Sequence, residues 1–578
     1  MQRRTVIKGL AASAASLAIQ PALARSLWRS PKAVDWSPLR ARLGERLIKV
    51  ESPLTRLRQA RGAGAADFFA RIQNPYLLGD DPGLTQTLGW IDAWTSQPSD
   101  YAVVAESAED IAAAIDFART QKVRLVVRGG GHSYFGNSNA ANSLMVWTRR
   151  MDSLDLHDAF VPKGAPPGTA SLPAISVGAG SMWGRVYRQA MVDNGRYVQG
   201  GGCLTVGVTG FTLGGGFGSF SKQFGTGAAN LLEAEVVTAD GVIRTVNELN
   251  EPDLFFALKG GGGGSFGVVS RLTFRTHQLP ETIGAVLMKV EARSDDAWRA
   301  LVARLIDFYA TALFNPNWGE QIRFEPGRSM SISMLFHGLD EAAARAVWQP
   351  MLGWLTDRRD NYLLEGEPTF LAVPGRRFWD PDFLRALPGI VQVDDRPGSP
   401  AGNIFWSGNK GEAGQVLHAY DSTWIPAHFL KAGEQSPLVD ALISAAAQWP
   451  VTLHTNKGLA GGARDALERT RRTSMNPSVI DSFALLICAA EGPPAWPGIP
   501  GHEPDAEFGR KQAAGVARAM APIHRLTPDS GAYMSETNYF TDNWKQAYWG
   551  EHYSRLAAAK RRYDPTGLFQ GHHGVEAT

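Results

Sequence analysis

Glycine is concentrated in three short regions of this sequence, and these regions constrain the fold more than any other feature. The chain contains 62 glycines, more than the usual share of about 7%. They gather at residues 129–131, 200–227 and 260–267. Because glycine has no Cβ, such runs let the backbone turn sharply and approach another group closely. The pattern predicts loops that pass close to a bound ligand.

Strand and helix patterns alternate around these loops. Apolar strands are predicted at 101–105, 123–127, 174–177 and 231–237. Ser107 occupies the N-cap position of a helix that has acids in its first turn. This alternation predicts an α/β or α+β domain. From about residue 286 longer helical segments and proline-rich connectors predict a second domain, as expected for a chain of 578 residues.

Composition and charge exclude several classes of function. The net charge is +2 and no basic cluster stands out, so nucleic acid is not expected as a partner. Beyond the N-terminus no run of ~20 apolar residues predicts a membrane span. The two cysteines, Cys203 and Cys488, do not make a disulfide scaffold, although one bridge stays open. Paired metal-type cysteines are absent from the sequence, so no metal site is predicted.

The N-terminus has the pattern of an export signal. Arg3 and Arg4 precede an apolar run at 9–19, and Ala22 and Ala24 frame a small-x-small cleavage site. The paired arginines favour the twin-arginine machinery. Residues 1–24 are therefore predicted to be a twin-arginine signal peptide, which would make the protein periplasmic or secreted. The alternative is a basic N-terminus followed by an alanine-rich helix.

The first glycine-rich loop follows a predicted strand. Residues 128–133 read Arg-Gly-Gly-Gly-His-Ser. Such a loop can point backbone N–H groups at an anion, and the charge of Arg128 would suit a diphosphate. His132 would then lie beside the ligand, where a neutral imidazole can act as a nucleophile. A tight turn with a surface histidine fits the same residues.

The second glycine-rich region frames a cysteine. Residues 200–210 read Gly-Gly-Gly-Cys-Leu-Thr-Val-Gly-Val-Thr-Gly, so Cys203 is accessible from one side and its thiolate could attack a ligand carbon. The alternative is a small buried apolar residue. In the third region, Gly262, Gly264 and Gly267 match a dinucleotide spacing, and Gly263, Ser265 and Gly267 match that of a hydrolase nucleophile. Both motifs need a strand before and a helix after. Here the predicted order is helix and then strand, so both are rejected.

Four ordered segments together resemble one family, the berberine-bridge-enzyme-like flavoproteins of the vanillyl-alcohol-oxidase superfamily, which have a PCMH-type FAD-binding domain. Residues 127–133 are similar to its first FAD loop, and residues 202–208 to the loop with the second flavin link. Residues 253–269 are similar to a further glycine-rich element. Residues 544–569 are similar to the C-terminal signature. The resemblance covers about residues 96–280 and 530–575.

The resemblance implies an α+β, two-domain fold. It implies an FAD-binding domain at 96–285, a substrate domain at 286–525 and a C-terminal segment at 526–578 that completes the FAD domain. Residues 25–95, which show no strong periodicity, are predicted to be an N-terminal extension that wraps the first domain. The substrate domain is expected to be an antiparallel sheet covered by helices. FAD would be bound covalently through His132 and also Cys203. The other implied cofactor residues are Arg128, Gly129, Gly130, Gly131, Ser133, Gly202, Thr205, Val206, Gly207, Gly210, Gly215 and Val237.

The implied activity is an FAD-dependent oxidase that removes hydride from an alcohol, a sugar or a phenolic or alkaloid-like metabolite and reduces O2 to H2O2. The alternatives are a dehydrogenase or oxidative cyclase with another electron acceptor, and a flavin-holding or sugar-binding protein without turnover. Val206 stands where a small residue goes with oxygen access in the family. Many relatives have histidine in place of Phe211, and this departure is expected to alter the flavin surroundings. Relatives often have asparagine in place of Ser535, which puts the usual catalytic-site contact at that position in doubt.

The base that accepts the substrate proton is expected just before the C-terminal signature. Residues 531–539 are predicted to form a strand, in which alternation puts Tyr533 and Tyr539 on one face and Glu536 on the other. Glu536 is the predicted base and Tyr539 the second choice, with Tyr533 nearby. A structural ion-paired glutamate is the alternative for Glu536. Asn456 and Lys457 are candidate substrate contacts, although a solvated lysine fits the same position.

Overall fold

A small mixed sheet carries the first glycine-rich loop. The computed structural model describes residues 28, 30 and 34–577. In this sheet the order is β1-β4-β6-β5, with β4–β6 and β5–β6 parallel and β1–β4 antiparallel. The strands are β1 (Leu47–Lys49), β4 (Tyr101–Val104), β5 (Arg124–Arg128) and β6 (Ser143–Trp147). The loop at residue 129 begins where β5 ends.

Helix α6 (Ala108–Gln121) connects β4 to β5 and begins where the sequence predicts. The Ser107 hydroxyl accepts a hydrogen bond from the Asp110 N–H at 3.3 Å, which satisfies one of the free donors of the first turn. Ile111, Ile115 and Ala118 are fully buried. The apolar face of the helix therefore forms part of one core with the small sheet.

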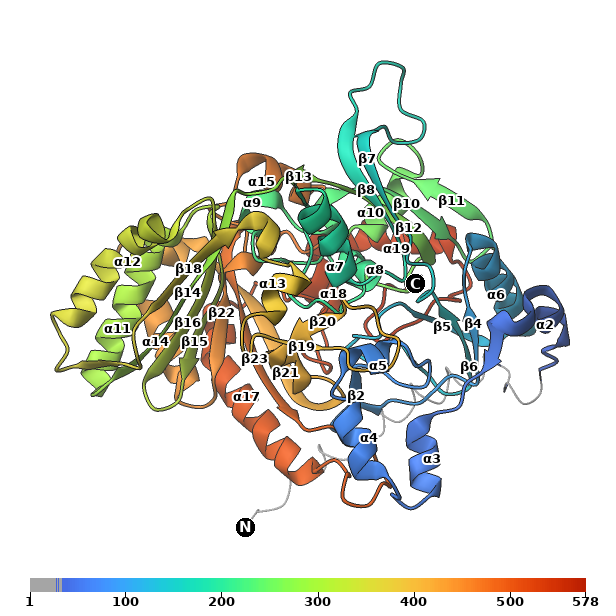
Figure 1. Cartoon of the computed structure of the whole chain (residues 1–578), viewed down its shortest axis with the longest axis horizontal. Helices are drawn as coiled ribbons and strands as arrows, with labels where there is room; N and C mark the ends of the chain where they lie inside the picture. Colours follow the sequence, from blue (N-terminus) through green and yellow to red (C-terminus); the bar gives the residue numbers. More distant parts are fainter. Residues whose placement is uncertain (1–27, 29, 31–33, 578) are drawn as a thin grey trace, which may run out of the picture.

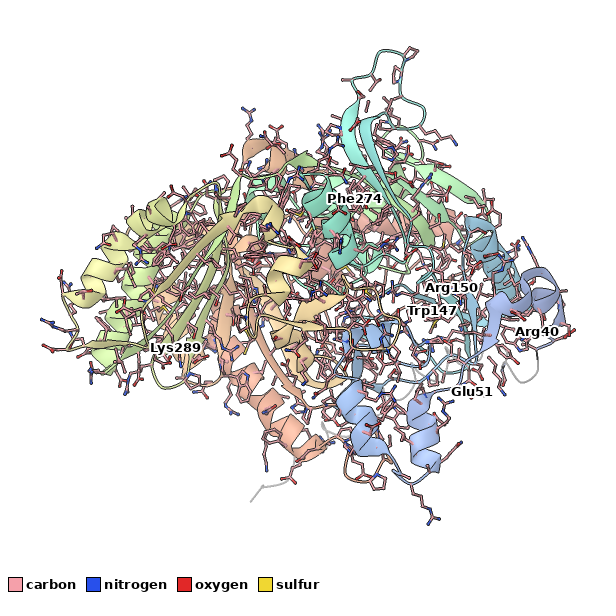
Figure 2. All side chains as sticks on the ribbon, in the orientation of Figure 1. Arg40, Glu51, Trp147, Arg150, Phe274 and Lys289 are labelled. Atoms are coloured by element: carbon pink, nitrogen blue, oxygen red, sulfur yellow. The ribbon has the colours of Figure 1, made fainter. Side chains whose placement is uncertain are left out.

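A five-stranded antiparallel sheet follows, in the order β11-β10-β12-β8-β7. Its strands are β7 (Leu154–Phe160), β8 (Leu172–Gly178), β10 (Leu231–Val237), β11 (Ile243–Val246) and β12 (Val268–Arg275). Phe274 on β12 is fully buried and is labelled in Figure 2, as is Trp147 of the first sheet. The two other glycine-rich regions precede β10 and β12, so all three lead into or out of these two sheets.

The chain from residue 282 onward supplies eight strands of a ten-stranded sheet, and β2 and β3 come from the N-terminal part. The order is β17-β14-β16-β15-β22-β23-β21-β2-β3, with β18 also paired to β14. Its strands are β14 (Thr282–Ala292), β15 (Trp318–Glu325), β16 (Ser329–His337), β17 (Tyr362–Leu364), β18 (Thr369–Pro374), β21 (Gln415–Pro426), β22 (Val451–His454), β23 (Ser482–Gly492), β2 (Thr87–Trp90) and β3 (Trp94–Thr95). Apart from the parallel pair β2–β21, the pairs are antiparallel.

Long helices cover this large sheet on the left of Figure 1. They are α11 (Asp295–Phe308), α12 (Glu341–Thr356), α14 (Ser436–Ala446) and α17 (Ala506–Leu526). Their apolar faces share one core with the alternate residues of the strands. The predicted α+β architecture, with an antiparallel sheet covered by helices, is confirmed.

The interval 25–95 was expected to be an extension around the first domain, and it does more than that. It holds the short helices α2 (Ser37–Leu43), α3 (Pro53–Gln59), α4 (Ala65–Arg71) and α5 (Pro75–Gly79). It also supplies β1 to the small sheet and β2 to the large one. Helices of five to seven residues are too short to show an apolar period in the sequence.

The C-terminal segment packs back onto the first domain. Helices α18 (Trp544–Trp549) and α19 (Tyr553–Tyr563) follow the large sheet, and α19 packs against α10 (Pro252–Leu258). The remaining elements around the site are α7 (Trp183–Tyr187), α8 (Val208–Leu213), α9 (Ser221–Phe224), β20 (Ile404–Trp406) and the one-turn helices η7 (Ser407–Lys410) and η9 (Thr455–Lys457). No helix among the described residues has the length and apolar character needed to cross a membrane. The predicted signal at 1–24 lies outside the described residues.

Candidate active site

One cavity of about 530 Å³ collects most of the predicted site residues. Its size is in the usual range for a small-molecule site. The predicted cofactor residues that line it are Gly129, Gly130, Gly131, His132, Ser133, Gly202, Cys203, Val206, Gly207 and Gly210. The third glycine-rich loop and the large sheet supply other walls. Three loops far apart in the sequence therefore converge on one space.

The first two loops touch each other through their backbones. A Cβ added at Gly130 would lie 2.8 Å from the Gly207 nitrogen, and one added at Gly207 would lie 2.8 Å from the Gly130 nitrogen. Any larger residue at either position would push the loops apart. Gly131 also has a φ of +79°, which other residues rarely adopt. The glycines are therefore needed to close this end of the cavity.

Other glycines leave space for a ligand. A Cβ at Gly202 or Gly210 would meet no protein atom within 4 Å, and both residues line the cavity. One at Gly264 would come no closer than 4.0 Å to Val127. The first, second and third loops thus each present glycine backbone to open space in the cavity. This cradle fits a long, partly flat cofactor such as a flavin dinucleotide.

His132 lies half-buried on the wall formed by the first loop. Burial lowers the pKa of His132 to about 4, a hydrogen bond with the Thr205 backbone opposes this, and the Arg128 charge adds to it. The imidazole is therefore neutral at pH 7. A neutral ring nitrogen can form a bond to an electrophilic carbon.

Cys203 lines the same cavity from the second loop. Its Sγ lies 3.4 Å from the Thr205 Oγ1. Burial raises the pKa of the Cys203 thiol, and the Glu412 charge adds to this. Cys203 and Cys488 are both free thiols, so the bridge that the sequence left open does not form. Nucleophilic attack by Cys203 would require a group that removes its proton.

Four predicted cofactor residues lie behind the walls of the cavity. The Arg128 guanidinium donates to the carbonyls of Leu78 at 2.6 Å and Asp81 at 2.9 Å and does not line the cavity. The expected contact of Arg128 with a diphosphate is therefore wrong. The side chain points from the end of β5 toward the N-terminal helices. The other three are buried and do not line the cavity: Thr205, Gly215 and Val237. They support the loops from behind.

The predicted strand at 531–539 is wrong. The segment has no partner strand and closes a turn instead, in which the Glu536 N–H donates to the Tyr533 carbonyl at 2.9 Å. As a result Tyr533 and Glu536 both line the cavity, which strand alternation would have forbidden. Tyr539 does not line it. Its ring stacks on His572, with centroids 3.7 Å apart.

The two predicted substrate contacts both line the cavity next to Glu536. Lys457 forms an ion pair with Glu536. Asn456 donates through Nδ2 to the Gly218 carbonyl at 3.2 Å and to Glu320 at 3.4 Å. Glu536 is therefore ion-paired, as the structural alternative to a catalytic base predicted, and it also faces the cavity. Lys457 is not a free surface lysine.

Several cavity residues were missed by the sequence analysis. They are Tyr134, Glu320, Glu412, Tyr420 and His454. Glu320 has a φ of +76°, an uncommon conformation for a residue with a side chain, and such strain concentrates at functional sites. Burial raises the pKa of its carboxyl. Nothing in the sequence marks Glu320 or Glu412, whereas the position of Tyr134 two residues after His132 could have pointed to it.

The two departures from the family pattern have different surroundings. Phe211 packs tightly, because a Cβ at Gly216 would lie 2.3 Å from its ring, and it makes an edge contact with Trp183 at 5.1 Å. Ser535 lies against Gly214, where a Cβ would come within 2.5 Å of its Oγ. Both residues line the cavity. Among the described residues, no cluster of three or more His, Cys, Asp or Glu could hold a metal ion.

Comparison with known proteins defines the class. Residues 99–247 match the model of an FAD binding domain, and residues 529–576 match that of berberine and berberine-like proteins. The FAD-linked oxidoreductase easE of Arthroderma otae is 31% identical over 492 residues, which cover 82% of this chain and 72% of that protein. The chain therefore belongs to the FAD-linked oxidoreductases of the berberine-bridge-enzyme-like group, and it is an enzyme of that class.

Two solved structures show the same fold. The VAO-type flavoprotein MtVAO615 of Myceliophthora thermophila superposes with a TM-score of 0.73 at 24% identity, over 95% of this chain and 96% of that one. The glucooligosaccharide oxidase of Acremonium strictum superposes with a TM-score of 0.62 at 20% identity, over 83% and 92%. That enzyme carries a 6-S-cysteinyl, 8α-N1-histidyl FAD.

Proposed function

We propose that this enzyme is an oxidase that holds its FAD covalently through His132 and Cys203. One observation carries the proposal: the two nucleophilic side chains lie on adjacent loops of one glycine-lined cavity. The doubly linked flavin of the Acremonium strictum structure supports it. When bound, the flavin accepts a hydride from the substrate carbon.

Acid precipitation of the purified holoenzyme tests the covalent link. We expect the yellow colour to stay with the denatured pellet, because a covalent bond survives unfolding and a bound but unlinked flavin does not. The pellet is then digested, and flavin-bearing peptides are identified by mass spectrometry. Peptides that contain His132 and Cys203 are the expected result. A colourless pellet with all flavin in the supernatant would contradict the proposal.

The substrate is proposed to be a small alcohol, sugar or phenolic or alkaloid-like compound that enters beside Tyr134, Tyr420 and Tyr533. All three phenols line the cavity, and burial holds the pKa of each well above its usual value. They therefore remain protonated hydroxyls. They can hydrogen-bond and stack with a ring or a polyol.

Molecular oxygen is the proposed electron acceptor. Val206, a small aliphatic residue, lines the cavity on the loop of Cys203. We expect equimolar hydrogen peroxide under air when a substrate bleaches the flavin. A peroxidase-coupled assay under air and dye reduction under argon measure this. Turnover with dye but none with oxygen would instead identify a dehydrogenase or an oxidative cyclase.

Export through the twin-arginine machinery is the remaining part of the proposal. Its support is the pair Arg3 and Arg4 followed by an apolar run and the small residues Ala22 and Ala24. In a bacterial host, the mature protein is expected to start at Arg25 in the periplasmic fraction. Changing Arg3 and Arg4 to lysine together should retain it in the cytoplasm. Export that continues unchanged in the Lys-Lys variant would contradict the twin-arginine route.

A further inference from the structure

Glu412 lies on the cavity wall next to the cysteine loop. It follows η7 and precedes β21, and it lines the cavity. The Trp406 indole N–H, at the end of β20, donates to the Gly202 carbonyl at 2.7 Å. This bond fixes the segment that bears Glu412 against the residue next to Cys203. Glu412 is therefore held on the side of the cavity where the cofactor link is proposed.

The carboxyl of Glu412 differs from the other cavity acids in its partners. Glu536 is paired with Lys457, and Glu320 accepts from the Ser219 hydroxyl and from Asn456. Glu412 accepts a hydrogen bond from the neutral amide of Asn409 at 3.1 Å. Among the described residues no Lys, Arg or His approaches it closely enough to form an ion pair. Burial without a countercharge disfavours the charged form of a carboxyl, so Glu412 takes up a proton more readily than an exposed or ion-paired carboxyl does.

The groups that face Glu412 strengthen this property. Burial raises the pKa of Glu412 to about 7, and the charges of Glu491 on β23 and Glu536 in the C-terminal segment add to the effect, while Asn409 opposes it. Tyr134 and Tyr420 flank the space with ring centroids 5.2 Å apart, and Cys203 is close enough to respond to the Glu412 charge. No cation is among these groups. Both tyrosines stay protonated, so they orient a hydroxyl and cannot take its proton.

We propose that Glu412 is the proton acceptor in the oxidation of the substrate hydroxyl, and that Glu536 positions Lys457. This inference rests on the proposed function. In the step, the substrate O–H bond breaks and its proton moves to the Glu412 carboxylate. The neighbouring C–H bond breaks with both of its electrons, which leave as a hydride to the oxidised flavin. A carbonyl forms, so the substrate is oxidised and the flavin reduced by the same two electrons.

The role of proton acceptor fixes the direction in which the rate of flavin reduction depends on pH. A proton acceptor works in its carboxylate form, whose fraction rises as the pH rises through about 7. The rate of flavin reduction is therefore expected to increase through this range and then level off. Ideal general bases titrate near the working pH. Glu491 also has a raised pKa through burial, so it needs its own control.

Two measurements on the holoenzyme test the proposal. The first needs no substrate: the absorbance of the bound flavin is titrated with pH in wild type, Glu412→Gln, Glu491→Gln and Glu536→Gln. A transition near pH 7 is expected in wild type. In Glu491→Gln and Glu536→Gln the transition is expected to persist at a lower pH, because the charges of both residues raise the pKa of Glu412. Loss of the transition is expected in Glu412→Gln. No transition in wild type, or its persistence in Glu412→Gln, would overturn the proposal.

The second measurement is anaerobic stopped-flow reduction, with cellobiose and vanillyl alcohol as probes. Glu412→Gln is expected to slow reduction about 10²–10⁴-fold and to flatten the pH profile. Glu412→Asp should recover part of the rate and restore the profile, which a purely structural role would not do. Glu536→Gln should be slower yet keep the pH step. A Glu412→Gln rate within threefold of wild type would overturn the proposal. Failure of both probes to bleach the wild-type flavin bears on the proposed substrate classes, and the spectral titration then decides the role of Glu412.

Discussion

Replacement of His132 and Cys203 by alanine together is expected to give a protein that keeps no flavin after acid precipitation, whereas either single variant keeps some. The expectation follows from the cavity, since each side chain reaches it from its own loop. Loss of one attachment leaves the other loop and the glycine cradle in place. The measurement is the ratio of flavin to protein absorbance in the washed pellet, with wild type as the reference.

The chain offers a matched control for this experiment. Cys488→Ser changes the second cysteine, which is buried on β23 and does not line the cavity. Its flavin ratio should equal that of wild type. A double variant whose pellet remains yellow would place the covalent attachment on another residue. A single variant that loses all covalent flavin would show that one link must form before the other.

The pH of loading should affect the two links differently. The His132 ring is neutral across the physiological range, because burial lowers its pKa to about 4. The Cys203 thiol has a raised pKa, so its thiolate fraction grows as the pH rises. The histidyl link alone is therefore favoured at low pH. The charge of Glu412 also raises the pKa of Cys203, so the protonation of these two residues is linked.

Local sequence patterns predicted most of the scaffold. The N-cap at Ser107, the strands predicted at 123–127 and 231–237 and the rejection of the two motifs at 260–267 depended on short-range rules. The structure confirms them, with the first strand found at 124–128. The glycine-rich regions could be placed on a ligand because a run without Cβ atoms has few other uses. Their meeting in one cavity required the family resemblance.

The site residues that were missed are set by tertiary contacts. Glu412 reaches the cavity because Trp406 fixes its segment to Gly202, about 200 positions away in the sequence. Arg128 looked like an anion contact until the buried carbonyls of Leu78 and Asp81 were seen to take its guanidinium. The turn at 533–536 is closed by the hydrogen bond from the Glu536 N–H to the Tyr533 carbonyl. No local pattern of side chains reveals that this segment has no partner strand.

Lys560→Met is expected to destabilise the enzyme by about 3–5 kcal/mol, the usual cost of leaving one partner of a buried ion pair alone. The Lys560 ammonium is buried and donates to the Asp564 carboxylate at 2.7 Å. It also donates to the carbonyls of Ser265 and Phe569, both at 2.6 Å. Methionine keeps an unbranched side chain one atom shorter than lysine, but it leaves all three acceptors without this donor. The urea midpoint and the melting temperature of the holoenzyme measure the loss.

Two further variants separate the charge from the packing. Lys511→Met removes an exposed lysine that pairs with Glu507 one helical turn away, and it should change stability by no more than about 0.5 kcal/mol. Combining Lys560→Met with Asp564→Asn removes the unpaired carboxylate and should recover part of the loss. Because Ser265 lines the cavity, Lys560→Met should also lower flavin loading. If Lys560→Met melts within a degree of wild type, the ion pair does not hold the C-terminal segment on the cofactor loop. If the double variant is no more stable than Lys560→Met alone, the unpaired carboxylate charge does not cause the loss of stability. The loss then comes from packing and from the hydrogen bonds to the two carbonyls.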